Sequence, residues 1–235
     1  MGRPAKTSVV AIFSVTSFLL GLLLISYSFV GSWWSNWIVS AAARAYHREA
    51  TGLSQLEIDW HFQRAYNHNA ELSRLDETSF LWLGHFARLP DDYMDILNVG
   101  GVMARLRIPS IRVDLPILHT TSQDVMEGGV GHLEGTAFPT GGYGNHTAMT
   151  AHSGAPTHFF SRLYRLEEGD LFYIYVLDRR LVYQVDRITV ILPSEIEHLR
   201  VEPGRDLVTL ITCTPIHVNT HRLLVRGVRV GYGSD

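Results

Sequence analysis

The N-terminal part of the chain contains one long segment without charge. No Asp, Glu, Lys or Arg occurs between Lys6 and Arg44, and the residues from Val9 to Val30 are almost all apolar. A helix of that length rises about 1.5 Å per residue and measures about 33 Å, enough to cross the hydrocarbon core of a bilayer. The segment therefore predicts a single transmembrane helix.

The residues around this segment give it an orientation. Arg3 and Lys6 precede it, and positive charge stays on the cytoplasmic side of a membrane helix. Three tryptophans follow it like an interfacial aromatic belt, Trp33, Trp34 and Trp37. A cleaved signal peptide is the alternative, but its apolar core would be only about 7–15 residues long. We expect a single-pass cell-membrane protein with a cytoplasmic N-terminus and an extracellular remainder.

Cysteine content and net charge exclude several kinds of site. Cys213 is the only cysteine, which excludes an internal disulfide and any multi-cysteine zinc or iron–sulfur site. The formal net charge of −3 argues against a basic nucleic-acid surface. The sequence has no carboxylate cluster typical of calcium sites and no histidine pair at metal-ligand spacing. We expect no metal, no cofactor and no nucleic-acid partner.

The chain divides into three parts by composition. Residues 1–34 form the cytoplasmic tip and membrane anchor, residues 35–99 a helical stalk and candidate lid, and residues 100–235 a β-rich domain. Helical spacing of apolar residues continues to about Leu75, and Gly52 could divide it into two helices. The irregular stretch that follows carries several aromatic residues, including Phe80, Trp82 and Tyr93. These aromatic side chains either pack on the wall of the domain or cover a site.

From Met103 onward the pattern is that of short β-strands. Seven or so strands with few helices indicate a closed or nearly closed barrel. A short helix is expected after Ser122, an open glycine-rich loop from Gly128 to Gly144, and one or two helical turns at Phe159–Leu163. The expected strands are Met103–Ile108, Ile111–Ile117, His146–Ala151, Leu171–Val176, Leu181–Leu192, Leu207–Cys213 and Leu223–Val230.

Cys213 stands where a nucleophile could act. It ends an apolar strand, and Pro215 stops that strand just beyond it. A thiol needs a nearby cation or hydrogen-bond partner to become a thiolate, and His152 and Arg222 are the candidate partners. A buried, unreactive cysteine is the alternative, because lone thiols are often core residues. Composition and spacing alone leave both possibilities open.

Several short sequence motifs resemble the signature of the sortase family. They are TLITCTP at 209–215 with NTHRLLVRG at 219–227, GVGHLEGT at 129–136, TAHSG at 150–154, and GDLF at 169–172 with YQVD at 183–186. The resemblance runs from about Met103 to Tyr232 and is strongest to class C, the pilus-assembling sortases. It implies an eight-stranded sortase-type β-barrel, so the expected fold is mainly β with an N-terminal transmembrane helix and a helical or lid segment.

The resemblance also implies a chemistry and a set of partners. Cys213 takes the place of the family's nucleophile, His152 of its acid–base and Arg222 of its oxyanion-binding residue. These residues would cleave a Leu-Pro-x-Thr-Gly-like (LPxTG-like) sorting signal between Thr and Gly through a thioacyl intermediate. The partners would be pilin or surface proteins carrying such signals, and the acceptor a pilin lysine amine. Alternatives are a housekeeping sortase that uses a cell-wall precursor amine, and a non-enzymatic surface-assembly factor.

Three departures from the family pattern bear on the site. The family motif around the histidine usually reads Gly-His-Arg-Gly, and in this chain Ser153 replaces its arginine. The candidate lid, which includes Phe80, Trp82 and Tyr93, lacks the Asp-Pro pair that anchors class C lids. Many class C sortases also have a second membrane helix at the C-terminus, whereas this chain ends at Asp235. In addition, Arg226 lies an even number of strand residues from Arg222 and could compete for its role.

Overall fold

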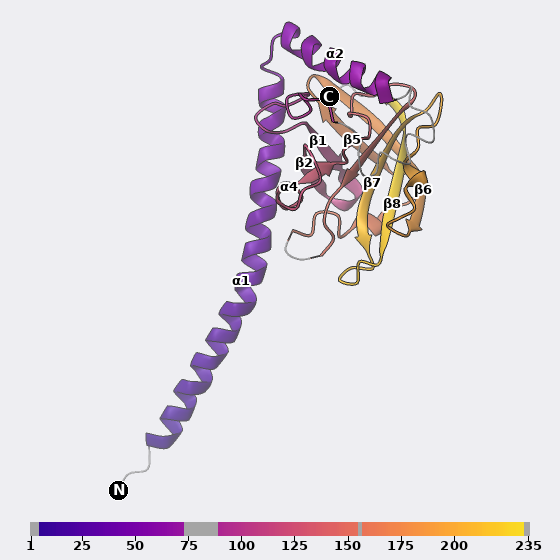
Figure 1. Cartoon of the computed structure of the whole chain (residues 1–235). Helices are drawn as coiled ribbons and strands as arrows, with labels where there is room; N and C mark the ends of the chain where they lie inside the picture. The colour runs from indigo at the N-terminus through magenta and orange to yellow at the C-terminus, as the bar shows by residue number, and fades with distance from the viewer. Residues whose placement is uncertain (1–4, 73–88, 155–156, 233–235) are drawn as a thin grey trace.

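Two helices precede a β-barrel in the computed structural model, which describes residues 5–72, 89–154 and 157–232 (Figure 1). Helix α1 spans Ala5–Ala50 and helix α2 spans Gln55–Leu72, so the break expected near Gly52 is confirmed. Ser54 and Glu57 start α2 by exchanging hydrogen bonds between their side chains and backbone amides. This reciprocal arrangement is a capping box, and it satisfies amide groups that have no partner within the helix.

The N-terminal half of α1 extends away from the barrel (Figure 1). Its described large apolar side chains are exposed, namely Ile12, Phe13, Val15, Phe18, Leu19, Leu20, Leu22 and Leu23. Among the residues that the structure describes, no helix has an apolar stretch long enough to cross a membrane. The structure therefore does not support the expected transmembrane helix from Val9 to Val30. Some side chains of that segment, with those of Trp33, Trp34 and Trp37, lie outside the described residues.

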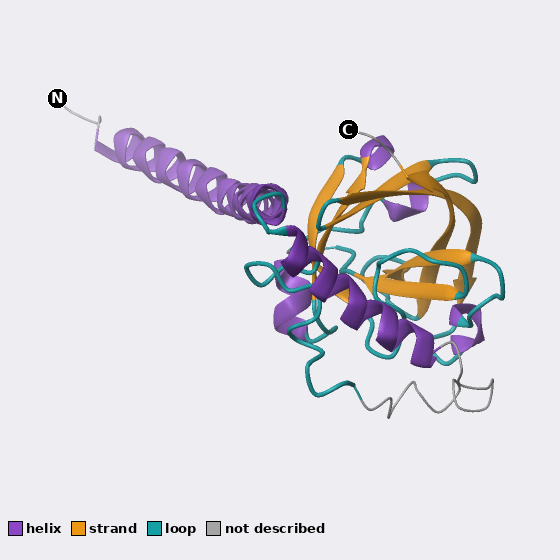
Figure 2. Ribbon diagram, turned by 90° about the horizontal axis from the view of Figure 1, so that it is seen from above, coloured by secondary structure: helices purple, strands orange, loops and turns teal. Residues whose placement is uncertain are grey.

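Eight strands close into a barrel, which confirms the expected mainly β fold (Figure 2). The strand order is β1-β2-β3-β4-β7-β8-β6-β5, and only the β2–β3 and β4–β7 pairs are parallel. Short helices lie between strands, namely η1 (Pro109–Ile111), α4 (Gln123–Gly128), η2 (Leu163–Arg165) and η3 (Ile196–Leu199). The strands are β1 (Ala104–Ile108), β2 (Val113–Leu118), β3 (Val130–His132), β4 (Asn145–Thr150), β5 (Leu171–Val176), β6 (Arg179–Ile191), β7 (Asp206–Thr214) and β8 (His221–Tyr232).

The sequence prediction was wrong at two of these elements. Strand β3 lies in the stretch expected to be an open glycine-rich loop. It is only three residues long and packs closely, because a Cβ at Gly131 would lie 2.5 Å from the carbonyl oxygen of Thr120. The helical turns expected at Phe159–Leu163 are hydrogen-bonded turns, and the helix itself is η2, at Leu163–Arg165. The expected short helix after Ser122 is confirmed as α4.

The helices are attached to the barrel by buried polar contacts as well as by apolar packing. The Tyr46 hydroxyl on α1 donates to the carbonyl of Met103 (3.0 Å) and accepts from the amide of Leu177 (2.8 Å). The Asn69 side chain on α2 forms two hydrogen bonds with the backbone of Phe138 (3.1 and 2.8 Å). Breaking either contact would leave buried polar groups without partners, which costs about 1–3 kcal/mol per group. These contacts therefore fix how both helices lie on the barrel.

Two buried histidines of the barrel form hydrogen bonds that fit the neutral imidazole. His132 Nε2 donates to the carbonyl of Ala137 (3.0 Å), so its Nδ1 accepts from the Tyr93 hydroxyl (2.8 Å). His146 Nδ1 donates to the carbonyl of Arg200 (2.7 Å), and its Nε2 accepts from Thr209 (2.7 Å). Both rings are satisfied in the neutral form, and burial lowers the pKa of each to about 4.

We predict that the free energy of unfolding falls as the pH drops from about 6.5 towards 4. The unfolded histidines bind protons with a pKa near 6.5 while the folded rings do not, so acid favours the unfolded state. Each ring should cost roughly 2 kcal/mol between pH 7 and pH 5. Chemical denaturation at both pH values measures this difference. It should shrink in His132→Gln but not in His217→Gln, an exposed control; an equal difference in both variants would contradict the prediction.

Candidate active site

The pairing of β7 with β8 brings Cys213 and Arg222 opposite each other. Cys213 is the penultimate residue of β7, and the antiparallel register pairs its Cα with that of Arg222 on β8. Both residues are half-buried, and Cys213 is a free thiol. Arg222 donates through one Nη atom to the carbonyls of Asn219 and His221 (both 3.1 Å). The guanidinium is therefore held beside the strand that carries the thiol.

The parallel pairing of β4 with β7 brings His152 to the same end of the barrel. The last residue of β4, Thr150, pairs with Ile211. The amide of Ala151 donates to the Ile211 carbonyl (3.2 Å), and the Thr212 hydroxyl donates to the Ala151 carbonyl (2.8 Å). His152 follows directly, so it leaves β4 at the level where Cys213 sits on β7.

All three predicted catalytic residues line one groove of about 370 Å³. The groove runs over the outer face of the sheet formed by β4, β7 and β8 and is bordered by the segment between β6 and β7. Part of its apolar lining comes from a small hydrophobic cluster separate from the main core, through Ile191, Leu199, Ile211 and Leu224, and from Leu133, which packs against that cluster. The site thus combines a thiol, an imidazole and a guanidinium with an apolar surface that can bind hydrophobic side chains.

Sequence reasoning missed this apolar wall. The signal was present on two strands, because Ile211 lies two residues before Cys213 and Leu224 lies two residues after Arg222. Residues two apart on a strand share a face, so Ile211 lies on the same face as Cys213, and Leu224 on the same face as Arg222. Leu133 and Leu199 carry no such signal, because they come from segments outside the strands.

Arg222 and Arg226, the two candidate arginines, lie in different surroundings. Arg226 does not line the groove; it is buried and pairs with Asp186 (2.7 Å) and Glu202 (2.5 Å), and Asp186 also binds Arg205 (2.6 Å). Burial acts to raise the pKa of Asp186, but hydrogen bonds from Arg226 and Arg205 outweigh it and keep the pKa below its ordinary value. In the part of the chain that the structure describes, Arg222 makes no such ion pair. Its guanidinium is the one available to a ligand in the groove.

The described part of the chain includes Tyr93 of the three candidate lid residues. Phe80 and Trp82 lie outside the described residues, so the lid stays a prediction from the sequence. Tyr93 is buried between His132 and Phe138 and does not line the groove. Its hydroxyl accepts from the amide of Thr120 (3.3 Å), and burial raises the pKa of that hydroxyl. Among described residues, no group of three or more His, Cys, Asp or Glu could hold a metal ion.

Ser153, which replaces the arginine of the resembled motif, joins the two halves of the site. Its hydroxyl donates to the backbone carbonyl of Cys213 (2.7 Å). The residue after the histidine is therefore tied to the residue that carries the thiol. Sequence reasoning noted the replacement but not this bond.

We predict that Ser153→Ala lowers the free energy of unfolding by about 1 kcal/mol, the usual net contribution of one hydrogen bond. Ser153→Thr keeps the hydroxyl and should lose less. Ser122→Ala removes a hydroxyl that makes no capping bond to α4 and serves as the control. Chemical denaturation compares the three variants. If Ser153→Ala is as stable as Ser122→Ala, the bond to Cys213 contributes nothing.

Comparison with known proteins shows which family the chain resembles. A sortase-domain family model matches residues 106–230, more than half of the chain. Sortase A of Bacillus anthracis is 30% identical over 137 residues, which are 57% of this chain and 63% of that protein. The chain thus spans somewhat less than two thirds of the length of this curated relative.

Solved structures agree with this match. Sortase C1 of GBS pilus island 1 has a TM-score of 0.75 and 38% identity, covering 83% of this chain and 93% of that one. Sortase C-1 from Streptococcus pneumoniae has a TM-score of 0.73 and 37% identity, covering 82% and 100%. Both structural neighbours are class C pilin sortases. With its thiol, imidazole and guanidinium in one groove, the chain belongs to the sortase family of cysteine transpeptidases.

Proposed function

We propose that this chain cleaves an LPxTG-like sorting signal between Thr and Gly and transfers the new acyl group to a lysine amine of a pilin. The observation that carries the proposal is the shared groove of Cys213, His152 and Arg222. The class C pilin sortases among its structural neighbours support a pilin as the partner.

In the proposed reaction, the thiolate of Cys213 attacks the Thr carbonyl carbon. Arg222 stabilises the resulting oxyanion by charge-assisted hydrogen bonds. His152 protonates the leaving Gly amine as the C–N bond breaks, which leaves a thioester on Cys213. The incoming amine then attacks the thioester and gives its proton to His152. A new amide bond forms, and the thiolate of Cys213 departs.

The apolar wall of the groove gives this reaction its substrate preference. Leu199 and Leu224 offer a surface beside Cys213 that suits the Leu and Pro of a sorting signal. Burying one leucine side chain contributes about 1.5–3 kcal/mol. Binding there would place the Thr carbonyl of the signal near the thiol.

Two alternative functions remain, and experiments distinguish them from the proposed one. A housekeeping sortase would use the same groove with a cell-wall precursor amine as acceptor, and the relative from Bacillus anthracis is a sortase A. Mass analysis of the transfer product distinguishes a lysine isopeptide from a cell-wall adduct. A non-enzymatic assembly factor would have no need for the thiol, imidazole and guanidinium to share one groove.

The cellular location stays part of the proposal. The uncharged segment of the sequence supports a single membrane anchor with a cytoplasmic N-terminus, and the exposed apolar side chains between Ile12 and Leu23 are consistent with one. The barrel would then be extracellular, where sorting signals of surface proteins are exposed. Protease treatment of intact cells tests this topology, because a barrel that stays protected would contradict it.

We predict that Cys213→Ala abolishes both signal cleavage and the covalent thioacyl adduct, while the protein stays folded. The half-buried sulfur contributes little packing, and no other residue of the chain carries a thiol. His152→Gln should remove most turnover but leave Cys213 open to alkylation. Mass spectrometry of protein incubated with a sorting-signal peptide detects the adduct. An adduct or normal turnover in Cys213→Ala would overturn the mechanism.

We predict that replacement by lysine impairs catalysis at Arg222 and stability at Arg226. Arg222→Lys should lower kcat/KM at least about tenfold, because a lysine cannot reproduce the planar fork of the guanidinium. Arg226→Lys should mainly lower stability, because a lysine cannot keep all three bonds that the buried guanidinium donates to Asp186 and Glu202. Peptide-cleavage kinetics and denaturation of both variants measure these effects. The arginine assignment is wrong if Arg226→Lys loses activity while Arg222→Lys keeps it.

A further inference from the structure

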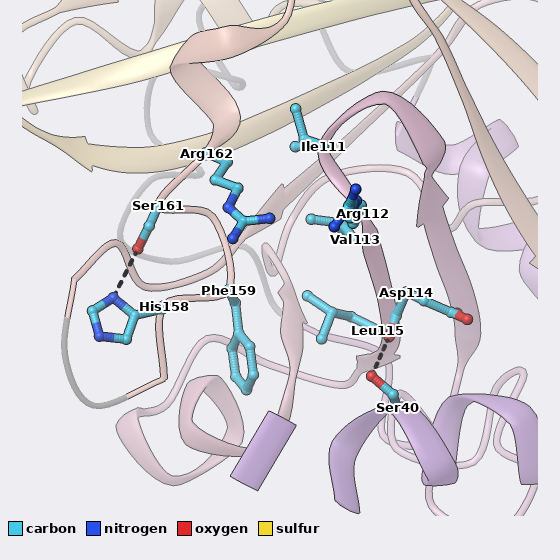
Figure 3. Close-up of a pocket in the computed structure, with 10 residues that line it drawn as sticks. All are labelled: Ser40, Ile111, Arg112, Val113, Asp114, Leu115, His158, Phe159, Ser161 and Arg162. Carbon is cyan, nitrogen blue, oxygen red and sulfur yellow. Dashed lines mark hydrogen bonds between the residues drawn. The ribbon is translucent and has the colours of Figure 1, made fainter. Parts of the chain in front are cut away.

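A second pocket, of about 320 Å³, lies on the barrel away from the groove (Figure 3). One wall is the junction of η1 with β2, which carries Arg112. The facing wall is the segment from His158 to Arg162, and Ser40 of α1 closes one side. None of its lining residues lines the groove of Cys213. The pocket is therefore a site that the proposed chemistry does not use.

Two arginines are among the polar residues of this pocket. Arg112 and Arg162 line it from different walls, and the His158 ring lies beside the Ser161 hydroxyl (3.3 Å). In the described part of the chain, neither arginine side chain has an ion pair or hydrogen-bond partner. The acidic lining residue, Asp114, is already held by Arg105 through two bonds of 2.7 Å. Two uncompensated guanidinium groups thus share one concave surface.

The backbone holds two of these residues in an uncommon conformation. Arg112 and His158 have φ angles of 58° and 53°, in the left-handed region that non-glycine residues seldom adopt. Such conformations are costly and tend to gather where a side chain must be presented to a ligand. Here they occur at the two facing walls of the same pocket.

Four buried apolar residues also line the pocket, namely Ile111, Val113, Leu115 and Phe159. A ligand that fits therefore has an anionic group for the arginines and an organic part that tolerates an apolar surface. Guanidinium groups bind phosphate oxygens in a bidentate manner, more strongly than single neutral hydrogen bonds.

We propose that this pocket binds a phosphate group through Arg112 and Arg162. The phosphate comes either from the headgroup of an anionic lipid or from a soluble phosphate compound. The lipid source is compatible with the position of the pocket, because Ser40 of α1 lines it and donates to the Asp114 carbonyl (3.1 Å), and the N-terminal half of α1 extends away from the barrel (Figure 1). Binding here is independent of the transpeptidation proposed above, so either proposal can fail alone.

The test measures calorimetric binding to the full chain in neutral detergent. The probes are inorganic phosphate, and short-chain phosphatidylglycerol in mixed micelles with phosphatidylcholine micelles as the blank. The test variant combines Arg162→Gln with Arg112→Asn, because asparagine tolerates the left-handed backbone at position 112. The control is Arg187→Gln, an exposed arginine on β6 outside the pocket. Melting temperatures verify that all variants are folded.

We expect saturable binding of at least one probe, weakened tenfold or more in the double variant and changed less than twofold in Arg187→Gln. A lipid source predicts that phosphatidylglycerol binds at least tenfold more tightly than inorganic phosphate. A soluble source predicts that inorganic phosphate binds as tightly as the lipid. Absence of saturable binding to both probes, a smaller loss in the double variant, or an equal loss in the control would overturn the proposal.

Discussion

Strand β7 is the element on which the candidate site depends. Its parallel pairing with β4 runs from Asn145 opposite Asp206 to Thr150 opposite Ile211, and this register sets the position of His152. Its antiparallel pairing with β8 sets the position of Arg222. A shift of one residue in either pairing would turn each side chain to the other face of the sheet. The three functional groups are therefore aligned by backbone hydrogen bonds rather than by contacts among themselves.

The two faces of β7 contact different parts of the protein. Leu210 and Val208 point into the barrel and belong to the main core, while Ile211 belongs to the small cluster that borders the groove. The segment between β6 and β7 covers this outer face. It is held there by Glu202, whose carboxylate binds Arg205 and Arg226. The ion-pair network thus supports the groove wall without entering the groove.

The sequence predicted most of the fold, and the three residues that it proposed as catalytic line one groove, but their supporting contacts were not predicted. Periodicity located seven strands, and the motif around Cys213 located its partners. Strand β3 was missed because a three-residue strand with glycine at its centre has no detectable alternation. The role of Ser153 was missed because its partner is a backbone carbonyl sixty residues away. Whether Tyr93 packs on the domain wall or covers a site was left open by the sequence, because an aromatic residue in an irregular segment has no periodicity to assign its face.

Closure of the barrel has a consequence for how a peptide can be recognised. A substrate often binds by adding itself as an extra strand to an exposed sheet edge, where free amide and carbonyl groups provide affinity for any sequence. Here every strand, β1 through β8, has a neighbour on both sides for at least part of its length, so no strand is an edge along its whole length. Under the proposed function, a peptide in the groove contacts the outer faces of β4, β7 and β8, so recognition rests on side chains rather than on a free sheet edge.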